Sequence, residues 1–225
     1  MRVLYHYPLC PFSRKVRFLM HEKKLDFTSE IENFWQERPS LLKMNAAGTV
    51  PVLVDINSAI ISDDTAIVEY LEEVYLDKNF LGSNIAQKTE VRRLISWFDK
   101  KFYSEVSEPI FVEKIIKRFK KDHGLGGPNS TLLRGAKTAI SYHLEYISWL
   151  CDRRNWLGGE EFSLADITAA AHLSMIDYFG DVPWDRHIEA KNWYVRIKSK
   201  PTFRNFFTDR VPGFPPSEFY ENLDF

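Results

Sequence analysis

Cys10 stands where a cysteine can act as a nucleophile. Residues 5–17 follow the pattern of a short strand, a tight turn and a helix start, with Cys10 between Pro8 and Pro11. Pro11 suits the first turn of a helix, because the N–H group that it lacks would have no partner there. Free N–H groups and the helix dipole favour an anion, so a thiol here can ionise below its ordinary pKa of about 8.5. Cys10 is therefore a candidate catalytic residue, although a small residue filling a tight turn would give the same pattern.

The spacing of apolar residues predicts the helix that follows this turn. The residues that recur at helical spacing are Phe12, Val16, Leu19 and Met20. The charged residues of the stretch, which fall mostly elsewhere around the helix, are Arg14, Lys15, Arg17, Glu22 and Lys23. We expect one amphipathic helix with a reactive group at its start.

The composition is that of a globular protein. Of 225 residues, 44% are hydrophobic, which is enough for one large domain or two small ones. No apolar run approaches the roughly 18 residues that cross a membrane, and the N-terminus lacks the features of a secretion signal. We expect a cytoplasmic protein without a membrane span.

Charge and cysteine content argue against several classes of function. Cys10 and Cys151, the two cysteines, lie far apart in the sequence, so we expect reduced thiols rather than a disulfide framework. A formal net charge of −1 argues against nucleic-acid binding. The six histidines lack the spacing of metal ligands, so no metal site is predicted. The basic residues within 114–121 suggest a solvated helix face or, as the alternative, a docking patch for an acidic partner.

The first third of the chain alternates between strand and helix patterns. The order is strand, helix, strand, helix, strand, strand, helix, and the predicted strands lie near residues 3–5, 27–31, 52–56 and 60–61. This is the order of a thioredoxin-like domain.

After Lys78 the strand signals stop and long helical patterns take over. They lie near residues 91–102, 132–150, 164–179, 193–197 and 203–207. We therefore divide the chain into a thioredoxin-like domain (1–77), a linker (78–87) and an all-α domain with a Pro-rich tail (88–225).

One helix start in the all-α part is especially clear. Ser163 provides a hydroxyl at the cap and Asp166 a carboxylate three residues later, a close variant of the capping box. We assign both residues to folding rather than to chemistry.

Four segments in a fixed order carry a resemblance to a known family. They are Cys10 to Ser13, Asn45 to Val54, Asp63 to Leu71, and Ser163 to Asp166. In this order they resemble the glutathione transferase family over essentially the whole chain. The resemblance implies a thioredoxin-like N-terminal domain, an all-helical C-terminal domain and a homodimer.

The same resemblance implies roles for individual residues. The Val50–Pro51 peptide would be cis, leaving the Val50 backbone to pair with the cysteinyl part of glutathione. Cys10 would form a mixed disulfide with glutathione, as in the omega and dehydroascorbate-reductase classes, with Ser13 and Arg14 in support.

The pair Asp63 and Asp64 departs from the family pattern. Family members carry Glu or Gln followed by Ser, whose hydroxyl and helix N-terminus hold the γ-glutamyl carboxylate of glutathione. A carboxylate at Asp64 would face that carboxylate, at a cost of about 1 to 4 kcal/mol in a partly screened cleft. We therefore expect weak glutathione binding at best, and we expect Asp64 to cap the third helix instead.

The chain also resembles a family of alphaproteobacterial glutathione-transferase-like cell-division proteins that bind FtsZ without catalysis. The segments that carry this resemblance include residues 5–6, 11–14 and 22–25 and the tail 209–225, which ends in Leu223, Asp224 and Phe225. An extended tail with an apolar and acidic end suits docking in a groove, or it packs back onto its own domain. Trp35 either anchors a partner or packs an irregular segment.

Two hypotheses follow. The first is a non-catalytic cell-division regulator that binds FtsZ, without a cofactor, through Trp35 and the tail end. The second is a glutathione-dependent transferase or thiol transferase that uses Cys10 or Ser13, with glutathione held by Val50, Pro51, Asp63 and Asp64.

Overall fold

The N-terminal part of the chain forms a four-stranded mixed sheet. The computed structural model describes residues 1–120 and 126–223. Strand order is β2-β1-β3-β4, with β1 and β2 parallel and the other two pairings antiparallel. The strands are β1 (Arg2–His6), β2 (Phe27–Ile31), β3 (Val52–Val54) and β4 (Ile60–Ser62).

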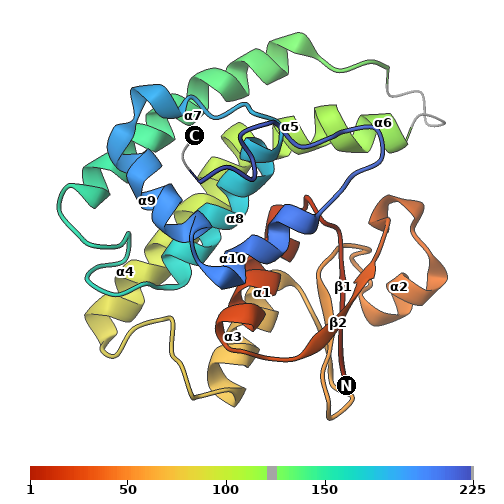
Figure 1. Ribbon diagram of the computed structural model, residues 1–225. Coiled ribbons are helices and arrows are strands. Elements are labelled where there is room, and N and C mark those ends of the chain that lie inside the picture. The colour runs from red at the N-terminus through yellow and green to blue at the C-terminus, as the bar shows by residue number, and fades with distance from the viewer. Residues whose placement is uncertain (121–125, 224–225) are drawn as a thin grey trace.

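Helices cover both faces of this sheet. α1 (Pro11–Glu22) and α3 (Asp64–Val74) lie on one side, and α2 (Pro39–Met44) lies on the other (Figure 1). Leu4 of β1 pairs with Leu53 of β3, and both side chains are fully buried. The predicted thioredoxin-like order is confirmed.

A long helical run opens the second part. It consists of α4 (Ile85–Ser96), η2 (Trp97–Ser107), α5 (Glu108–Phe111), η3 (Val112–Ile116) and α6 (Lys117–Phe119), which follow one another without a break. The turns of η2 and η3 are the wider turns of a π-helix. The run begins at Ile85, within the segment predicted as a linker.

The remaining helices follow this run, and α8 among them packs against α1, α4 and η2. They are α7 (Ser130–Cys151), α8 (Leu164–Tyr178), η5 (Trp184–Arg186), α9 (Ile188–Lys198), α10 (Pro201–Arg204) and η6 (Asn205–Thr208). Every residue of α8 is buried. The predicted capping box is confirmed. The Asp166 carboxylate accepts a hydrogen bond from the Ser163 backbone N–H at 3.0 Å, and the Ser163 side chain accepts one from the Asp166 backbone N–H.

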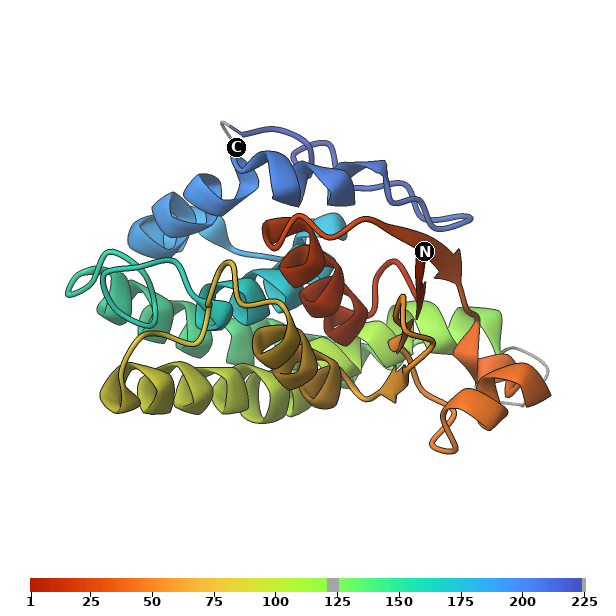
Figure 2. The ribbon, with the colours of Figure 1, turned by 90° about the horizontal axis from the view of Figure 1, so that it is seen from below.

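α1 joins the two parts of the molecule. It lies between the long helical run and the C-terminal helices (Figure 2). Its apolar spacing is as predicted, but its charged side is not open to solvent: Arg14 and Lys15 are no more than 1% exposed, and Arg17 is 7% exposed. Partners from the second part of the chain close over these cations, which local sequence does not reveal.

Candidate functional site

The Cys10 turn has the predicted backbone and an enclosed thiol. Cys10 precedes α1, with Pro11 in the first helical turn. The Cys10 thiol is 3.9 Å from the carbonyl oxygen of Val50, whose peptide bond to Pro51 is cis as the resemblance implied. The Ser13 hydroxyl accepts a hydrogen bond from the Tyr7 N–H at 3.3 Å. Cys10 is 5% exposed and Ser13 is fully buried.

The surroundings of Cys10 raise the pKa of its thiol, whereas a helix N-terminus alone would lower it. Burial raises the pKa of Cys10, and the nearby Asp64 charge raises it further. Hydrogen bonds from Ser13 and Phe12 act in the opposite direction but do not outweigh burial. The helix N-terminus therefore does not make Cys10 a thiolate, since desolvation of the charged form is the larger effect. Arg14, expected to support the thiol, bonds instead to Asp209 and Tyr220 in the tail.

Of the two adjacent aspartates, Asp63 and not Asp64 caps α3. Asp63 caps α3: its backbone has φ of 75°, and its carboxylate accepts from Thr65 N at 2.9 Å and Ala66 N at 3.2 Å. Asp64, expected to be the cap, is the first residue of the helix and forms an ion pair with Lys15. The prediction that Asp64 caps α3 is therefore wrong.

A chain of buried polar groups continues from Asp64 into the helical part. The Lys15 ammonium lies 2.5 Å from Asp99 Oδ2. The other oxygen of Asp99 is 3.2 Å from His172 Nε2, and His172 Nδ1 is 2.8 Å from the Ser107 hydroxyl. The chain thus joins α3, α1, η2 and α8.

The pKa directions follow from this arrangement. Burial raises the pKa of Asp64, Lys15 opposes that rise and Asp99 adds to it. Burial also acts against the charged form of Asp99, but Lys15 and His172 outweigh it, so the pKa of Asp99 is lowered. Lys15 pairs with both carboxylates, so the three groups carry one net negative charge when both aspartates are ionised.

The tail packs back onto the molecule and is anchored by Tyr220. Asp209 accepts from Arg14 at 3.0 Å and binds Arg17 through both oxygens at 3.0 Å. The Tyr220 hydroxyl, fully buried, lies 2.9 Å from Arg14 Nη1. Leu223 is half-buried, whereas the predicted partner residues Asp224 and Phe225 lie outside the described residues.

Trp35 both packs against neighbours and borders a cavity. It lies in η1 (Phe34–Gln36), stacks on Phe119 with ring centroids 5.7 Å apart, and meets the Tyr7 ring edge at 4.9 Å. The cavity has a volume of about 360 Å³ and is also lined by Val211 and Pro212 of the tail. Three segments that are distant in the sequence therefore meet at Trp35.

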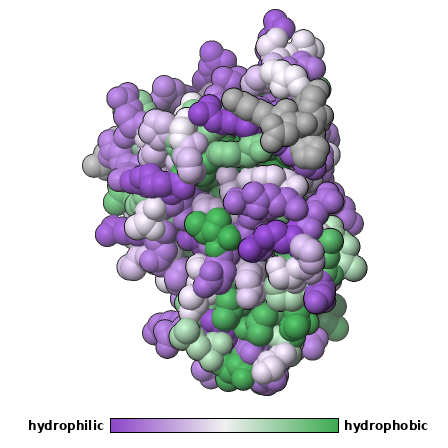
Figure 3. Space-filling view, turned by 90° about the vertical axis from the view of Figure 1, so that its right-hand side faces the viewer, coloured by the Kyte–Doolittle hydropathy of each residue, from purple (hydrophilic) through white to green (hydrophobic). Residues whose placement is uncertain are grey.

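Exposed apolar side chains lie on the face of the molecule that carries α2. Figure 3 shows the face that carries α2 in Figure 1, where apolar residues gather on the lower half. On β2 and α2, Ile31 is 60% exposed and Leu42 is 40% exposed. Apolar patches of this kind mark interaction sites more often than chance placement does.

Comparison with known proteins decides the family. A model of the N-terminal domain of glutathione S-transferases matches residues 9–74. FtsZ-localized protein A of Caulobacter vibrioides is 43% identical over 227 residues, covering 100% of this chain and 98% of that protein. The chain belongs to the glutathione S-transferase family.

Solved structures of glutathione S-transferase family members share the whole fold. A glutathione S-transferase from Rhodospirillum rubrum F11 superimposes with a TM-score of 0.95 at 48% identity, covering all of both chains. FzlA from C. crescentus superimposes with a TM-score of 0.95 at 43% identity, covering 100% of this chain and 99% of that one. Glutathione S-transferase 2 of Saccharomyces cerevisiae is 25% identical over 92% of this chain and 90% of its own length.

Within this glutathione S-transferase family member, sequence reasoning missed Lys15 and Asp99. In the sequence, Lys15 is one of several charged residues in an amphipathic helix pattern, and Asp99 falls within the helical pattern near residues 91–102. A lysine one turn after the cysteine was the available signal, but its partner is 84 residues away. In the described segments, no group of three His, Cys, Asp or Glu residues could hold a metal ion, and no helix could span a membrane.

Proposed function

We propose that this chain is a non-catalytic cell-division protein that associates with FtsZ filaments. The observation that carries the proposal is the full-length 43% identity with a protein named FtsZ-localized protein A. The alignment covers the tail as well as the sheet domain. The more distant glutathione S-transferase relatives support an enzymatic role only weakly.

The cleft adds support because it is poorly suited to glutathione chemistry. The Cys10 thiol is buried and its pKa is raised, so little thiolate forms at neutral pH. By the family resemblance, Asp64, which is ion-paired with Lys15, stands where the carboxylate of glutathione would lie. We propose that glutathione is not a working substrate of this protein.

The partner surface that we propose is centred on Trp35. This half-buried indole borders a cavity shared with the tail, and Ile31 nearby is 60% exposed. Aromatic residues in such partly enclosed places commonly dominate binding energy. We propose that the end of the tail, Leu223 to Phe225, takes part in the same surface; it follows the Tyr220 anchor in the sequence, and the structure describes Leu223 of it.

Cytoplasmic location and homodimerisation belong to the same proposal. FtsZ filaments form in the cytoplasm, and the family resemblance implies a dimer. A dimer would present two copies of the Trp35 surface, which could engage neighbouring subunits of one filament with increased avidity.

Co-sedimentation with FtsZ polymer tests the proposal. We expect the wild-type protein to pellet with polymer and Trp35→Ala to remain largely in the supernatant. Trp149→Ala is the matched control, because Trp149 is 48% exposed and stacks on Tyr146 at 6.1 Å, away from the Trp35 cavity. Equal pelleting of both variants would contradict the proposed surface.

A truncation separates the tail end from the folded tail. Removing residues 223–225 leaves Tyr220 and its bonds to Arg14 and the Phe206 carbonyl in place, so folding should be preserved. We expect this truncation to weaken co-sedimentation. Unchanged co-sedimentation would restrict the partner surface to Trp35 and its neighbours.

A further inference from the structure

β2 forms one edge of the sheet, and its outer side is open. The strand order β2-β1-β3-β4 places β2 first (Figure 1). Within residues 1–120 and 126–223, no strand pairs with that outer side and no turn or loop bond closes it. Its last three residues, Ser29, Glu30 and Ile31, are exposed. An open sheet edge presents a row of backbone donors and acceptors with which another chain can pair.

Ser29 and Ile31 supply the free backbone groups of this edge. The Glu32 N–H donates to the His6 carbonyl of β1 at 2.8 Å. Successive residues of a strand direct their backbone groups to opposite sides, so Glu30 also faces β1. Ser29 and Ile31 therefore face away from β1, towards solvent.

This edge lacks the usual protection against strand pairing. Edge strands of natural proteins are commonly blocked by lysine, by proline or by a bulge. The sequence of β2 is Phe-Thr-Ser-Glu-Ile, which contains neither lysine nor proline. Its register with β1 runs from residue 27 to residue 31 without a bulge. The strand is therefore able to accept a further strand along its exposed residues.

The open edge leads directly into the Trp35 cavity. Ile31, at the end of β2, is 60% exposed and lines that cavity together with Asn33 and Trp35. Val211 and Pro212 of the tail also line it. A chain that pairs with β2 and continues past Ile31 therefore reaches the cavity with its next residues.

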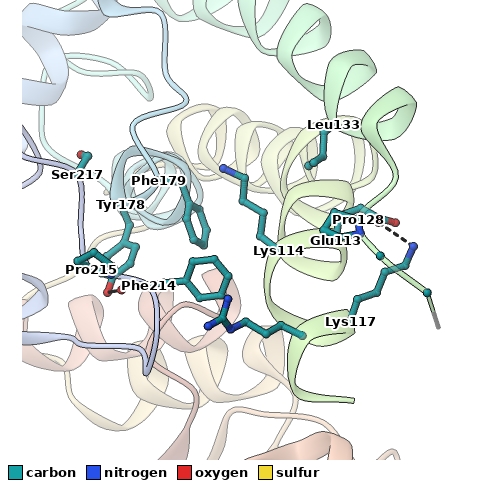
Figure 4. A pocket seen from close by; sticks show the side chains of 13 residues that line it. Glu113, Lys114, Lys117, Pro128, Leu133, Tyr178, Phe179, Phe214, Pro215 and Ser217 are labelled. Carbon is teal, nitrogen blue, oxygen red and sulfur yellow. Dashed lines mark hydrogen bonds and ion pairs between the residues drawn. The ribbon is translucent and has the colours of Figure 1, made fainter. Parts of the chain in front are cut away.

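The tail residues that line the cavity are held in place by α8. The Val211 N–H donates to the Tyr178 hydroxyl at 3.3 Å, and this hydroxyl donates to the Phe214 carbonyl at 2.6 Å. Phe214 packs edge to face against Phe179, with ring centroids 5.9 Å apart (Figure 4). This part of the cavity is therefore formed before a partner binds, which avoids the entropic cost of ordering it.

The charges along this route favour an uncharged segment. Arg210, which lines the cavity, pairs with Glu221 at 2.7 Å. Arg38 pairs with Glu32, the residue that follows β2. An acidic segment would compete with these two ion pairs and would meet the exposed Glu30 carboxylate, so a segment without charges and with apolar side chains fits better.

We propose that β2 receives an extended, uncharged segment of the partner as a fifth strand of the sheet. Backbone groups of that segment pair with the N–H and C=O groups of Ser29 and Ile31, and an apolar side chain beyond the paired stretch enters the Trp35 cavity. In such complexes main-chain hydrogen bonds give affinity and side-chain pockets give specificity. The inference rests on the proposed function, because it gives the binding mode of the FtsZ filament at the Trp35 surface.

A proline at position 29 tests the strand pairing. Ser29→Pro removes an outward N–H group and places a ring where the added strand would lie; edge strands tolerate proline where the N–H faces solvent. Ser29→Ala removes the hydroxyl but keeps the N–H, so it is the matched control. In co-sedimentation with FtsZ polymer, we expect Ser29→Pro to bind at least about tenfold more weakly than the wild type and Ser29→Ala to bind within about twofold of it.

The contrary outcomes separate this inference from the proposed function. If the wild type and Ser29→Pro pellet equally with polymer, strand addition is overturned and the proposed function stands. If Ser29→Ala loses as much binding as Ser29→Pro, the backbone is not what the partner recognises. A lower mass of free Ser29→Pro in analytical ultracentrifugation would assign the edge to a second copy of this chain. Failure of the wild type to pellet would refute both proposals.

Amide hydrogen exchange examines the same edge in the unmodified protein. In the free protein the Ser29 and Ile31 N–H groups should exchange fast and the Glu30 N–H slowly, because only the last is bonded within the sheet. In the complex pelleted with FtsZ polymer, exchange at Ser29 and Ile31 should slow by at least about tenfold, with little change at Glu30. Unchanged exchange at Ser29 and Ile31 in that complex would overturn the proposal, whether or not Ser29→Pro folds.

Discussion

We predict that replacing Asp64 by Asn raises the affinity of this cleft for glutathione. The Asp64 carboxylate is 13% exposed and shares Lys15 with Asp99. The substitution keeps the size of the side chain and removes one negative charge. Lys15 keeps its 2.5 Å contact with Asp99, so the variant should remain folded.

The size of the effect follows from the charges. Two unit charges about 4 Å apart repel by about 1 kcal/mol in water and about 4 kcal/mol at the effective dielectric constant of a protein surface. The cleft is partly open, so we take about 1 to 2 kcal/mol. That range corresponds to a gain in affinity of about fivefold to thirtyfold.

Isothermal titration calorimetry with glutathione measures this gain. We expect no resolved binding for the wild-type protein and resolved binding for Asp64→Asn and Asp64→Ser. Asp64→Glu retains the charge and is the matched control, which should behave as the wild type. Strong glutathione binding by the wild type, or an equal gain in Asp64→Glu, would refute the electrostatic argument.

Three further predictions concern ionisation and folding. Burial, with two nearby arginines, lowers the pKa of His6 to about 3, whereas in the unfolded chain this histidine takes up a proton near the ordinary value of 6.5. His6 should therefore contribute a fall of about 2 kcal/mol in the free energy of unfolding between about pH 7 and about pH 5, in addition to the contributions of His21, His143, His172 and His187, whose pKa values are also lowered. In urea titrations the fall should be smaller by that amount in His6→Phe, and an equal fall in the variant and the wild type would assign it to the other groups. Burial raises the pKa of both Cys10 and Cys151. A chromogenic disulfide reagent should therefore react slowly with the folded protein and rapidly after denaturation. Fast reaction of Cys10 in the folded protein would contradict the burial of its thiol. Asp166→Ala should lower the free energy of unfolding by about 3 kcal/mol or more, because four buried donors lose their acceptor. Ser163→Ala should lower it by about 1 kcal/mol. Similar losses in the two variants would argue against the Asp166 carboxylate as the acceptor that holds these four donors.

The sequence was sufficient for the order of elements because that order depends on local signals. Strand and helix periodicities, Pro11 in the first turn of α1, and the Ser163 capping box all act within a few residues. Each of these predictions is confirmed. The wide turns of η2 and η3 left no such signal, since their residues are also compatible with a regular α-helix.

The candidate site was less predictable because its chemistry depends on distant partners. Arg14 and Asp209 are 195 positions apart, and Lys15 and Asp99 are 84 apart. Which aspartate caps α3 depends on the backbone: only Asp63, with φ of 75°, turns its carboxylate towards the helix N–H groups. Burial of Cys10 likewise follows from tertiary packing, and burial reverses the pKa shift that the helix N-terminus alone would produce.

The most direct test of the central claim compares wild-type protein and Cys10→Ala in co-sedimentation with FtsZ polymer. If the protein acts in cell division through its surface and not through its thiol, both proteins should pellet with polymer to the same extent. Both should remain in the supernatant when FtsZ is kept unassembled with GDP. Failure of the wild type to pellet with polymer, or loss of pelleting in Cys10→Ala, would contradict the account.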